Sequence, residues 1–205
     1  MNLKKVVVGP VQTNCYILED RGESIIIDAG GDASAIIDAI SGSNSAPKAI
    51  LATHGHFDHV LAVNDLKKHY KIPFLINRRD LGVLDQFSEH IRFFLNRESG
   101  ETPVPDGFFK AGESVDFGGE SIRIIPTPGH TMGSTSFQVG GMLFTGDFIF
   151  RGSIGRTDVG GSGDEMRKSL AWLRGLEEDL VLYPGHGEIT TLRHEMDHNA
   201  YLRKE

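Results

Sequence analysis

The segment Thr53–His59 reads Thr-His-Gly-His-Phe-Asp-His, so that three histidines and one aspartate fall within six residues. Neutral imidazole and carboxylate groups are good ligands for borderline divalent metals. The segment follows an apolar run of strand type and leads into a predicted helix. His54 and His56 leave the extended part on the same side, whereas Asp58 and His59 belong to the first helical turn. One short segment therefore predicts ligands for two adjacent metal ions.

Three further segments each place one ligand-type side chain just past a predicted strand and beside a glycine. The residues are His130, Asp147 and His186. Glycine allows the backbone to approach closely at such a strand end. A single histidine in a loop is usually a surface residue, but the same arrangement at four strand ends indicates one common site.

The elements that must position these residues follow from short apolar runs. In the first half, runs at 6–8, 15–18, 24–27, 49–53 and 73–76 predict strands. Asp32 is expected to cap a helix, and a second helix is expected from about Asp58 to Tyr70. A third helical stretch is predicted from one apolar stripe, which consists of Leu84, Phe87, Ile91 and Phe94.

The second half repeats this alternation of strands and helices. Strands are predicted at 114–117, 121–125, 134–139, 142–144 and 180–183, and helices at 164–176 and from about Leu192. Strands in hairpins, together with strands that alternate with helices, indicate mixed sheets covered by helices, with the two sheets packed face to face.

Composition limits the class of protein and of partner. The 205 residues carry a formal net charge of −7 and one cysteine, Cys15. The net charge argues against a nucleic-acid partner, which needs a basic face, and no apolar run approaches the roughly 18 residues of a membrane span. The start lacks the pattern of a signal peptide, so we expect a cytoplasmic protein. The oligomeric state is left open.

The motif order HxHxDH, GHT, GD and PGHG resembles the metallo-β-lactamase superfamily, in its glyoxalase II-like branch. The resemblance covers nearly the whole chain and includes the segments Thr13–Tyr16 and Ile27–Gly30. It implies an α+β fold, a four-layer αβ/βα sandwich of two mixed β-sheets flanked by helices. It also implies a single domain over residues 1–205, with the metals at one edge between the sheets.

The resemblance further implies a centre with two divalent metal ions. The implied ligands are His54, His56 and His130 for one metal, Asp58, His59 and His186 for the second, and Asp147 as a bridge between them. Asp28 resembles the aspartate that orients the ligand loops by hydrogen bonding. Zinc is the expected metal, with iron and manganese as alternatives.

Two divalent ions about 3.5–4 Å apart would share a water and lower its pKa from near 15.7 to about 7. The resulting hydroxide would attack an acyl carbon, with Asp58 and Asp147 as the carboxylates of the catalytic centre. We expect a thioesterase that cleaves acyl-glutathione or a similar thioester. The zinc-type β-lactamases are discounted because they lack the final histidine of HxHxDH and commonly use a cysteine ligand.

A mono-iron persulfide dioxygenase is the alternative. Those enzymes resemble this chain over Arg151–Asp158 and use residues that match His54, His130 and Asp147. Their later motif differs from PGHG, which here resembles that of the hydrolases, so hydrolysis is favoured.

Two arginines in the loop after the bridging aspartate are the candidates for binding substrate. Arg151 and Arg156 are expected to overhang the metal cleft, where a guanidinium can hold a substrate carboxylate through two parallel hydrogen bonds. The alternative interpretation pairs Arg156 with Asp158 as a structural contact.

The segment His194–His198 matches HExxH, the zincin protease motif. We do not interpret it as a metal site, because only seven residues follow and no third ligand is available. A surface helix end that carries two histidines is the expected arrangement.

Overall fold

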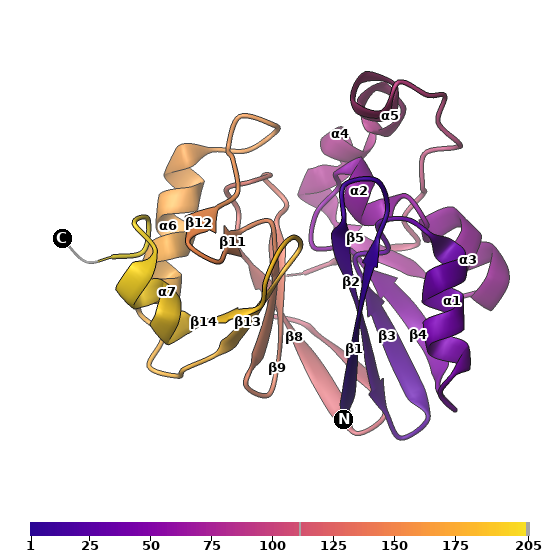
Figure 1. Cartoon of the computed structure of the whole chain (residues 1–205), viewed down its shortest axis with the longest axis horizontal. Helices are drawn as coiled ribbons and strands as arrows, with labels where there is room; N and C mark the ends of the chain where they lie inside the picture. The colour runs from indigo at the N-terminus through magenta and orange to yellow at the C-terminus, as the bar shows by residue number, and fades with distance from the viewer. Residues whose placement is uncertain (111, 204–205) are drawn as a thin grey trace.

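The computed structural model describes residues 1–110 and 112–203. It contains two six-stranded sheets that pack face to face, with helices on their outer sides (Figure 1). The first half of the chain builds one sheet and its helices, and the second half builds the other.

The first sheet has its strands in sequence order. They are β1 (Asn2–Val8), β2 (Thr13–Asp20), β3 (Glu23–Ile27), β4 (Ala46–Leu51), β5 (Phe74–Asn77) and β6 (Gly107–Phe109). The pairs β1–β2 and β2–β3 are antiparallel, whereas the pairs from β3 to β6 are parallel. Parallel neighbours need a crossover, and α1 (Ala33–Ser41) and α3 (Val63–Tyr70) lie in two of these connections.

The second sheet runs in the order β14, β13, β10, β9, β8, β7. Its strands are β7 (Ser114–Phe117), β8 (Glu120–Pro126), β9 (Thr135–Val139), β10 (Met142–Gly146), β13 (Val181–Pro184) and β14 (Thr190–Thr191). Only the pair β10–β13 is parallel among its pairs in the described residues. The outer helices are α6 (Gly163–Arg174) and α7 (Leu192–His198), beside the hairpin β11 (Ile149–Phe150) and β12 (Ser153–Ile154). The predicted fold class, two mixed sheets flanked by helices, is confirmed.

The central strands β2, β3, β9 and β10 are buried on both faces, which explains their apolar runs, whereas the edge strands β1 and β7 are partly exposed. In β2, Ile17 faces the core under the first-half helices, and its neighbour Leu18 faces the core between the sheets. In β10, Leu143 belongs to the core under α6 and α7, and Phe144 to the core between the sheets. Three apolar cores thus separate four layers.

The helix predicted from about Asp58 to Tyr70 is two helices in the structure, α2 (Phe57–Val60) and α3. They part at Ala62, whose backbone N–H leaves the helical pattern and donates to the carbonyl of Ala29 at 2.9 Å. This tertiary bond overrides the helical periodicity of the sequence.

The predicted capping role of Asp32 is wrong. Asp32 stands at the start of α1 with φ 44°, but its side chain makes no cap bond. Its carboxylate instead accepts a hydrogen bond from the backbone N–H of Gly9 at 2.8 Å, so that it ties the β1–β2 turn to the start of the helix.

The third predicted helical stretch is also divided. A 3₁₀ turn (Arg78–Asp80) and α4 (Leu81–Leu84) precede α5 (Phe87–Leu95). Phe87 and Ile91 are buried as the stripe predicts, but Phe94 at the end of the stripe is 55% exposed. No helix among residues 1–110 and 112–203 has the length and apolarity to cross a bilayer.

Candidate metal centre

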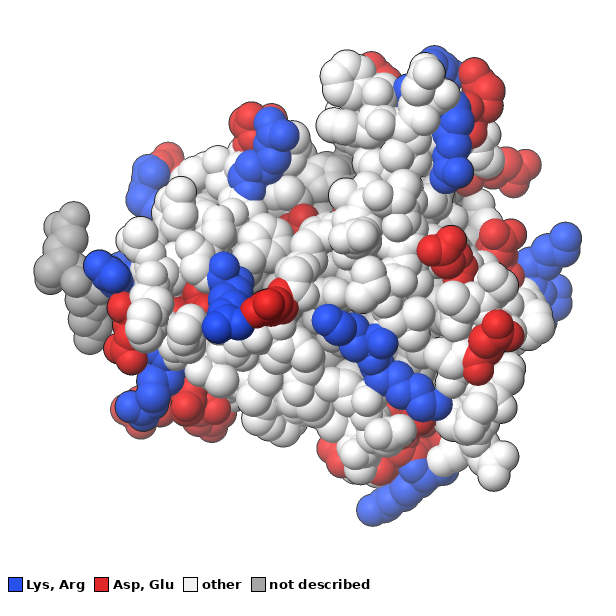
Figure 2. Space-filling model, viewed as in Figure 1, with Lys and Arg blue, Asp and Glu red and all other residues white. Residues whose placement is uncertain are grey.

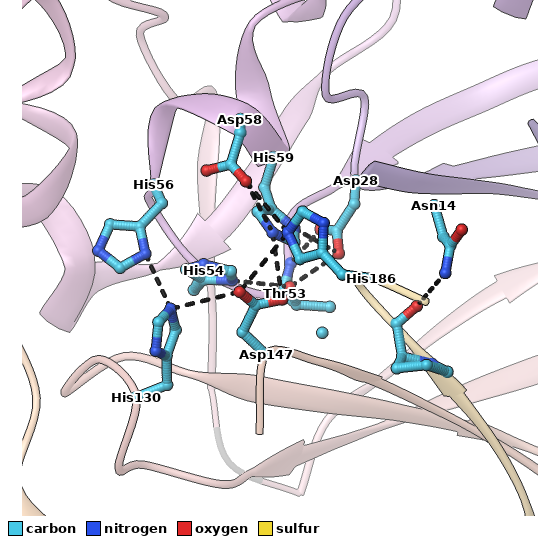
Figure 3. Close-up of polar contacts among 12 residues, drawn as sticks. Asn14, Asp28, Thr53, His54, His56, Asp58, His59, His130, Asp147 and His186 are labelled. Atoms are coloured by element: carbon cyan, nitrogen blue, oxygen red, sulfur yellow. Dashed lines mark hydrogen bonds and ion pairs between the residues drawn. The ribbon is translucent and has the colours of Figure 1, made fainter. Parts of the chain in front are cut away.

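The seven predicted ligands lie together where four loops meet (Figure 3). His54 and His56 follow β4, and α2 carries Asp58 and His59. The other three ligands each follow or end a strand of the second sheet, with His130 after β8, Asp147 after β10 and His186 after β13. Both halves of the chain therefore supply ligands, because the site lies at the edge where the two sheets meet.

The donor atoms fall into three groups, each within 4.8 Å. These are His54, His56 and His130, then His54, His59 and Asp147, and finally Asp58, His59 and His186. The first and last groups are the two ligand sets that the family resemblance implies. Asp147 lies between them, because its Oδ1 is 3.3 Å from Nε2 of His59 and its Oδ2 is 3.6 Å from Nε2 of His130.

Hydrogen bonds around the histidines fix which ring nitrogen faces the centre of the site. Nε2 of His56 lies 3.0 Å from the carbonyl of Val159, and Nδ1 of His130 lies 2.7 Å from the carbonyl of Arg156. A carbonyl only accepts, so each of these nitrogens carries the proton. The lone pairs then sit on Nδ1 of His56 and Nε2 of His130, which face each other at 2.9 Å. Two lone pairs pointing at one another repel unless a metal ion or a shared proton lies between them.

Nε2 of His54 is buried in the site without a hydrogen-bond partner, and Nε2 of His59 and Oδ1 of Asp147, also buried, lie 3.3 Å apart without the geometry of a hydrogen bond. Buried polar atoms are nearly always paired. Neutral imidazoles and ionised carboxylates with inward lone pairs suit divalent cations such as zinc or iron. The residues present therefore fit two such ions.

The first group of histidines is held neutral by its surroundings. Burial, followed by the neighbouring His130, lowers the pKa of His56 to about 4. Burial also lowers the pKa of His54 well below its usual value, with neighbouring imidazoles adding to the effect. At neutral pH both rings can bind a metal without first losing a proton.

The two histidines of the second group, His59 and His186, instead have raised pKa values. Burial acts to lower the pKa of His59, but the carboxylates of Asp28 and Asp147 outweigh it and raise that pKa well above its ordinary value. Burial would raise the pKa of Asp58, yet the charge of His59 and a hydrogen bond from His186 hold it well below the usual range. In the metal-free protein this group is an ion-pair cluster, and a metal must displace its protons.

Asp28 contacts the site from behind the ligands. Its Oδ1 accepts from the backbone N–H of Thr53 at 2.7 Å, and its Oδ2 accepts from the Thr53 hydroxyl at 2.8 Å. The same Oδ2 lies 3.0 Å from Nδ1 of His59. Asp28 thus holds the start of the ligand segment and orients one of its rings, which is the place that the resemblance implies.

Asp80 is a positioning residue that was not predicted from sequence. Its buried carboxylate accepts from the backbone N–H groups of Gly55 at 2.8 Å and Gly133 at 2.6 Å, and from the Thr131 hydroxyl at 2.8 Å. It therefore ties the segment of His54 and His56 to the loop of His130. No local pattern marks Asp80, which lies three residues past the end of β5 at the end of a 3₁₀ turn.

Asp80→Asn should lower the affinity of the protein for its first metal by about ten- to a hundredfold, as loss of a group that orients ligands does. The amide is the same size but offers one acceptor oxygen in place of two. Competition with a chromogenic chelator measures the affinity, and Asp85→Asn, at a nearby exposed aspartate, is the matched control. An unchanged affinity in Asp80→Asn would show that the two loops hold their positions without this clamp.

A second missed contact fixes the loop of His186. The side chain of Asn14, which is labelled in Figure 3, donates to the carbonyls of Pro184 at 2.9 Å and Gly187 at 3.1 Å. The Tyr16 hydroxyl donates to the carbonyl of Pro184 at 2.7 Å. A Cβ on Gly185 would lie 2.4 Å from Oδ1 of Asp147, so only glycine fits there. This accounts for Thr13–Tyr16 and for the glycine that precedes His186.

The two predicted substrate arginines are both paired in the structure. Nε and Nη2 of Arg156 donate to the two carboxylate oxygens of Asp158, each at 2.7 Å. Arg156 lines the cleft beside the ligands, whereas Arg151 pairs with Glu188 and is not among the residues that line it. The structure thus favours the alternative interpretation, a structural pair, for Arg156, and it places Arg151 outside the cleft.

The HExxH segment forms α7, with His198 exposed and His194 partly exposed. Neither histidine belongs to the three groups of donors, so the expectation of a surface helix end agrees with their positions. Glu195 is different, because its buried carboxylate accepts from the Thr190 hydroxyl at 2.6 Å and from the N–H of Gly152 at 2.8 Å. It anchors the loop that follows Asp147.

We expect Glu195→Ala to lower the free energy of unfolding by about 3 kcal/mol, because buried donors lose a charged acceptor. His198→Ala, one helical turn away and exposed, should change it by less than about 0.5 kcal/mol and leave the metal content unchanged. Denaturant unfolding and elemental analysis of both variants make the comparison. Loss of metal from a folded His198→Ala protein would overturn the assignment of α7 as a structural helix.

The chain belongs to the metallo-β-lactamase superfamily, because the model of that family matches residues 8–186. It is 32% identical to the hydroxyacylglutathione hydrolase GloC of Haemophilus influenzae, with 100% of both chains covered. It is similar to the solved structure of the BLEG-1 B3 metallo-β-lactamase, with 34% identity and a TM-score of 0.90 over 99% of this chain and 100% of the other. A di-iron-bound form of TTHA1623 is also similar, at 31% identity and a TM-score of 0.87 over 97% and 100%.

These similarities support a metal-dependent hydrolase of this superfamily, with a His and Asp cluster that could hold its metal. The zinc-type β-lactamases were discounted on the HxHxDH motif, and a protein described as a B3 metallo-β-lactamase is nevertheless similar to this chain over its full length.

Proposed function

We propose that this protein hydrolyses thioesters, with acyl-glutathione or a similar acyl thiol as its substrate, at a centre of two divalent metal ions. The observation that carries the proposal is the convergence of seven donor side chains, among which Nε2 of His54 is buried without a hydrogen-bond partner, beside an open cleft. The relative GloC, described as a hydroxyacylglutathione hydrolase and covered over its whole length, supports the substrate class.

When bound, two such ions supply an activated water and polarise the carbonyl that the water attacks. The chain contributes the fixed positions of the ligands and their charge, because Asp58 and Asp147 are both ionised at neutral pH. In the overall reaction a C–O bond forms from water and the C–S bond breaks. One product is a carboxylic acid, and the other is a thiol that takes up the proton.

Zinc is the metal that we propose, and the di-iron form of TTHA1623 supports iron as the alternative. We also propose a cytoplasmic location and a small-molecule substrate without a nucleic-acid or membrane partner. The net charge of −7 supports the absence of a nucleic-acid partner, and in Figure 2 acidic and basic residues alternate over the visible face without a basic patch.

Protein purified without added metal and then supplied with zinc or iron should hold close to two ions per chain. His186→Ala should hold close to one, because it removes a ligand of the second group only. Elemental analysis of both proteins provides the count. One tight ion at any supply, with no effect of His186→Ala, would contradict the two-metal model.

The same preparations should be tested with three substrates: an acyl-glutathione, a cephalosporin and glutathione persulfide. The proposal expects hydrolysis of the thioester, followed as released thiol. Turnover of the cephalosporin alone would replace the thioesterase by a β-lactamase. Oxygen uptake with the persulfide, without thioester hydrolysis, would move the protein to the dioxygenase alternative.

A further inference from the structure

The cleft beside the ligands has two walls of different chemistry. It encloses about 770 Å³, with His56, Asp58, His130, Asp147 and His186 among its lining residues. One wall comes from the first half of the chain, where α5 and the β1–β2 turn contribute, and the other from the loop that contains Arg156 and Asp158. In Figure 2 the surface is hollowed at the top of the view, and mainly uncharged residues form its α5 side.

Aromatic rings form much of the first wall. Phe57 lies between two ligands in the sequence, and its ring is stacked with that of Phe94 at 6.0 Å between centroids and 17° between planes. Phe57 is 6% exposed, whereas Phe94 is 55% exposed and Val11, in the β1–β2 turn that also lines the cleft, is 43% exposed. Large apolar side chains left open beside a polar site are typical of a ligand-binding surface.

The opposite wall offers no free positive charge. Arg156 is the one lysine or arginine among the described residues that line the cleft, and both oxygens of Asp158 occupy its guanidinium. The hydrogen bond from Arg156 lowers the pKa of Asp158 to about 2, so both members of the pair are charged at neutral pH and offset each other's charge. A carboxylate on the distant part of a substrate would meet no free cation here.

We propose that Phe94, together with Phe57 and Val11, forms a subsite for an aromatic or branched aliphatic group of the thioester substrate. This inference rests on the proposed function, since the group must be attached to the bond that is cleaved. Burying it against Phe94 removes two apolar surfaces from water and holds the carbonyl over the ligand cluster. Specificity then comes from apolar contact and not from a charged end of the substrate.

The apolar group can belong to the acyl part or to the thiol part of the thioester, and two substrate series separate these cases. The first series keeps one thiol and compares acetyl with phenylacetyl. The second keeps the acetyl group and compares a short polar thiol with benzyl thiol. Phe94→Ala is the test variant, and Phe93→Ala is the matched control, because Phe93 is the preceding residue of α5, is 78% exposed and does not line the cleft.

Phe94→Ala should lower kcat/KM about tenfold for the apolar member of one series and less than twofold for its small counterpart. Phe93→Ala should change neither. Phe94→Tyr should retain most of the preference, since the ring remains. Equal losses for both members of each series, or an equal effect of Phe93→Ala, would overturn the subsite.

Calorimetry with the zinc-loaded protein provides a readout that needs no turnover. The probe is the thioether that corresponds to the preferred apolar thioester and cannot be hydrolysed, and its affinity should fall about tenfold in Phe94→Ala. If the thioether binds in this way but no thioester is cleaved, the subsite holds and the proposed function fails. If thioesters are cleaved and neither binding nor preference depends on Phe94, the function holds and the subsite is rejected. Without binding and without turnover, both are rejected.

Discussion

Asp147→Ala should abolish tight binding of both metals and lower kcat/KM by at least about a thousandfold, which corresponds to ~4 kcal/mol of transition-state stabilisation. One oxygen of Asp147 lies 3.3 Å from Nε2 of His59, and the other lies 3.6 Å from Nε2 of His130. The second oxygen is also 3.7 Å from Nε2 of His186. Because these rings belong to different ligand groups, one substitution removes a ligand from each.

The metal content of Asp147→Ala is measured after dialysis against a weak chelator, beside kcat/KM at saturating metal. Asp147→Asn keeps the volume of the side chain and separates loss of charge from the cavity that alanine leaves. Asp164→Ala, at an exposed position on α6, controls for a general effect of removing an aspartate. Retention of two ions by a folded Asp147→Ala protein would show that this carboxylate is not shared between the metals.

Acidification should release the second metal before the first. The raised pKa of His59 means that this ring is a positively charged imidazolium in the metal-free protein at neutral pH. The pKa of His186 is also raised, because Asp58 and Asp147 outweigh the effect of burial. As the pH falls below these raised values, protons compete with the metal. The affinity of the second group should then drop about tenfold per pH unit for each proton displaced, or roughly a hundredfold or more between pH 8 and pH 6.

The first group should respond far less over the same range. The pKa of His56 is lowered to about 4, and that of His54 is also lowered, so these two rings stay neutral and compete with no proton until the pH approaches 4. Metal titrations of wild type and His186→Ala at pH 6, 7 and 8 distinguish the two groups. Equal pH dependence of both binding steps would contradict the difference in protonation that the structure indicates.

The ligands were predictable from sequence because each stands beside a local signal, a glycine or a strand end. The sheets were predictable for a related reason, since strands buried on both faces have continuous apolar runs. Asp80 and Asn14 had no such signal. Asp80 is linked to Gly133, 53 residues away, and Asn14 to Pro184, 170 residues away, and only the folded chain brings these partners together.

The errors have the same origin. Asp32 has the residue type of a helix cap, but its carboxylate accepts a hydrogen bond from the N–H of Gly9 instead. The helical pattern after Asp58 is continuous in sequence, but Ala62 bonds to Ala29 and divides it. Arg156 follows the bridging aspartate as a substrate-binding arginine would, but Asp158 occupies its guanidinium. In each case a contact that local sequence does not encode decided the outcome.

The order of the ligands along the chain also determines when each ion can be captured during synthesis on the ribosome. The group of His54, His56 and His130 is complete while residues 131–186 are still to be translated, and the shared carboxylate at position 147 follows soon after. The group of Asp58 and His59 must wait for His186, whose loop is fixed only when β13 has joined the second sheet. If two ions bind as proposed, vectorial translation would complete the first ligand group while the half-built second sheet still lacks His186, the residue that completes the second group.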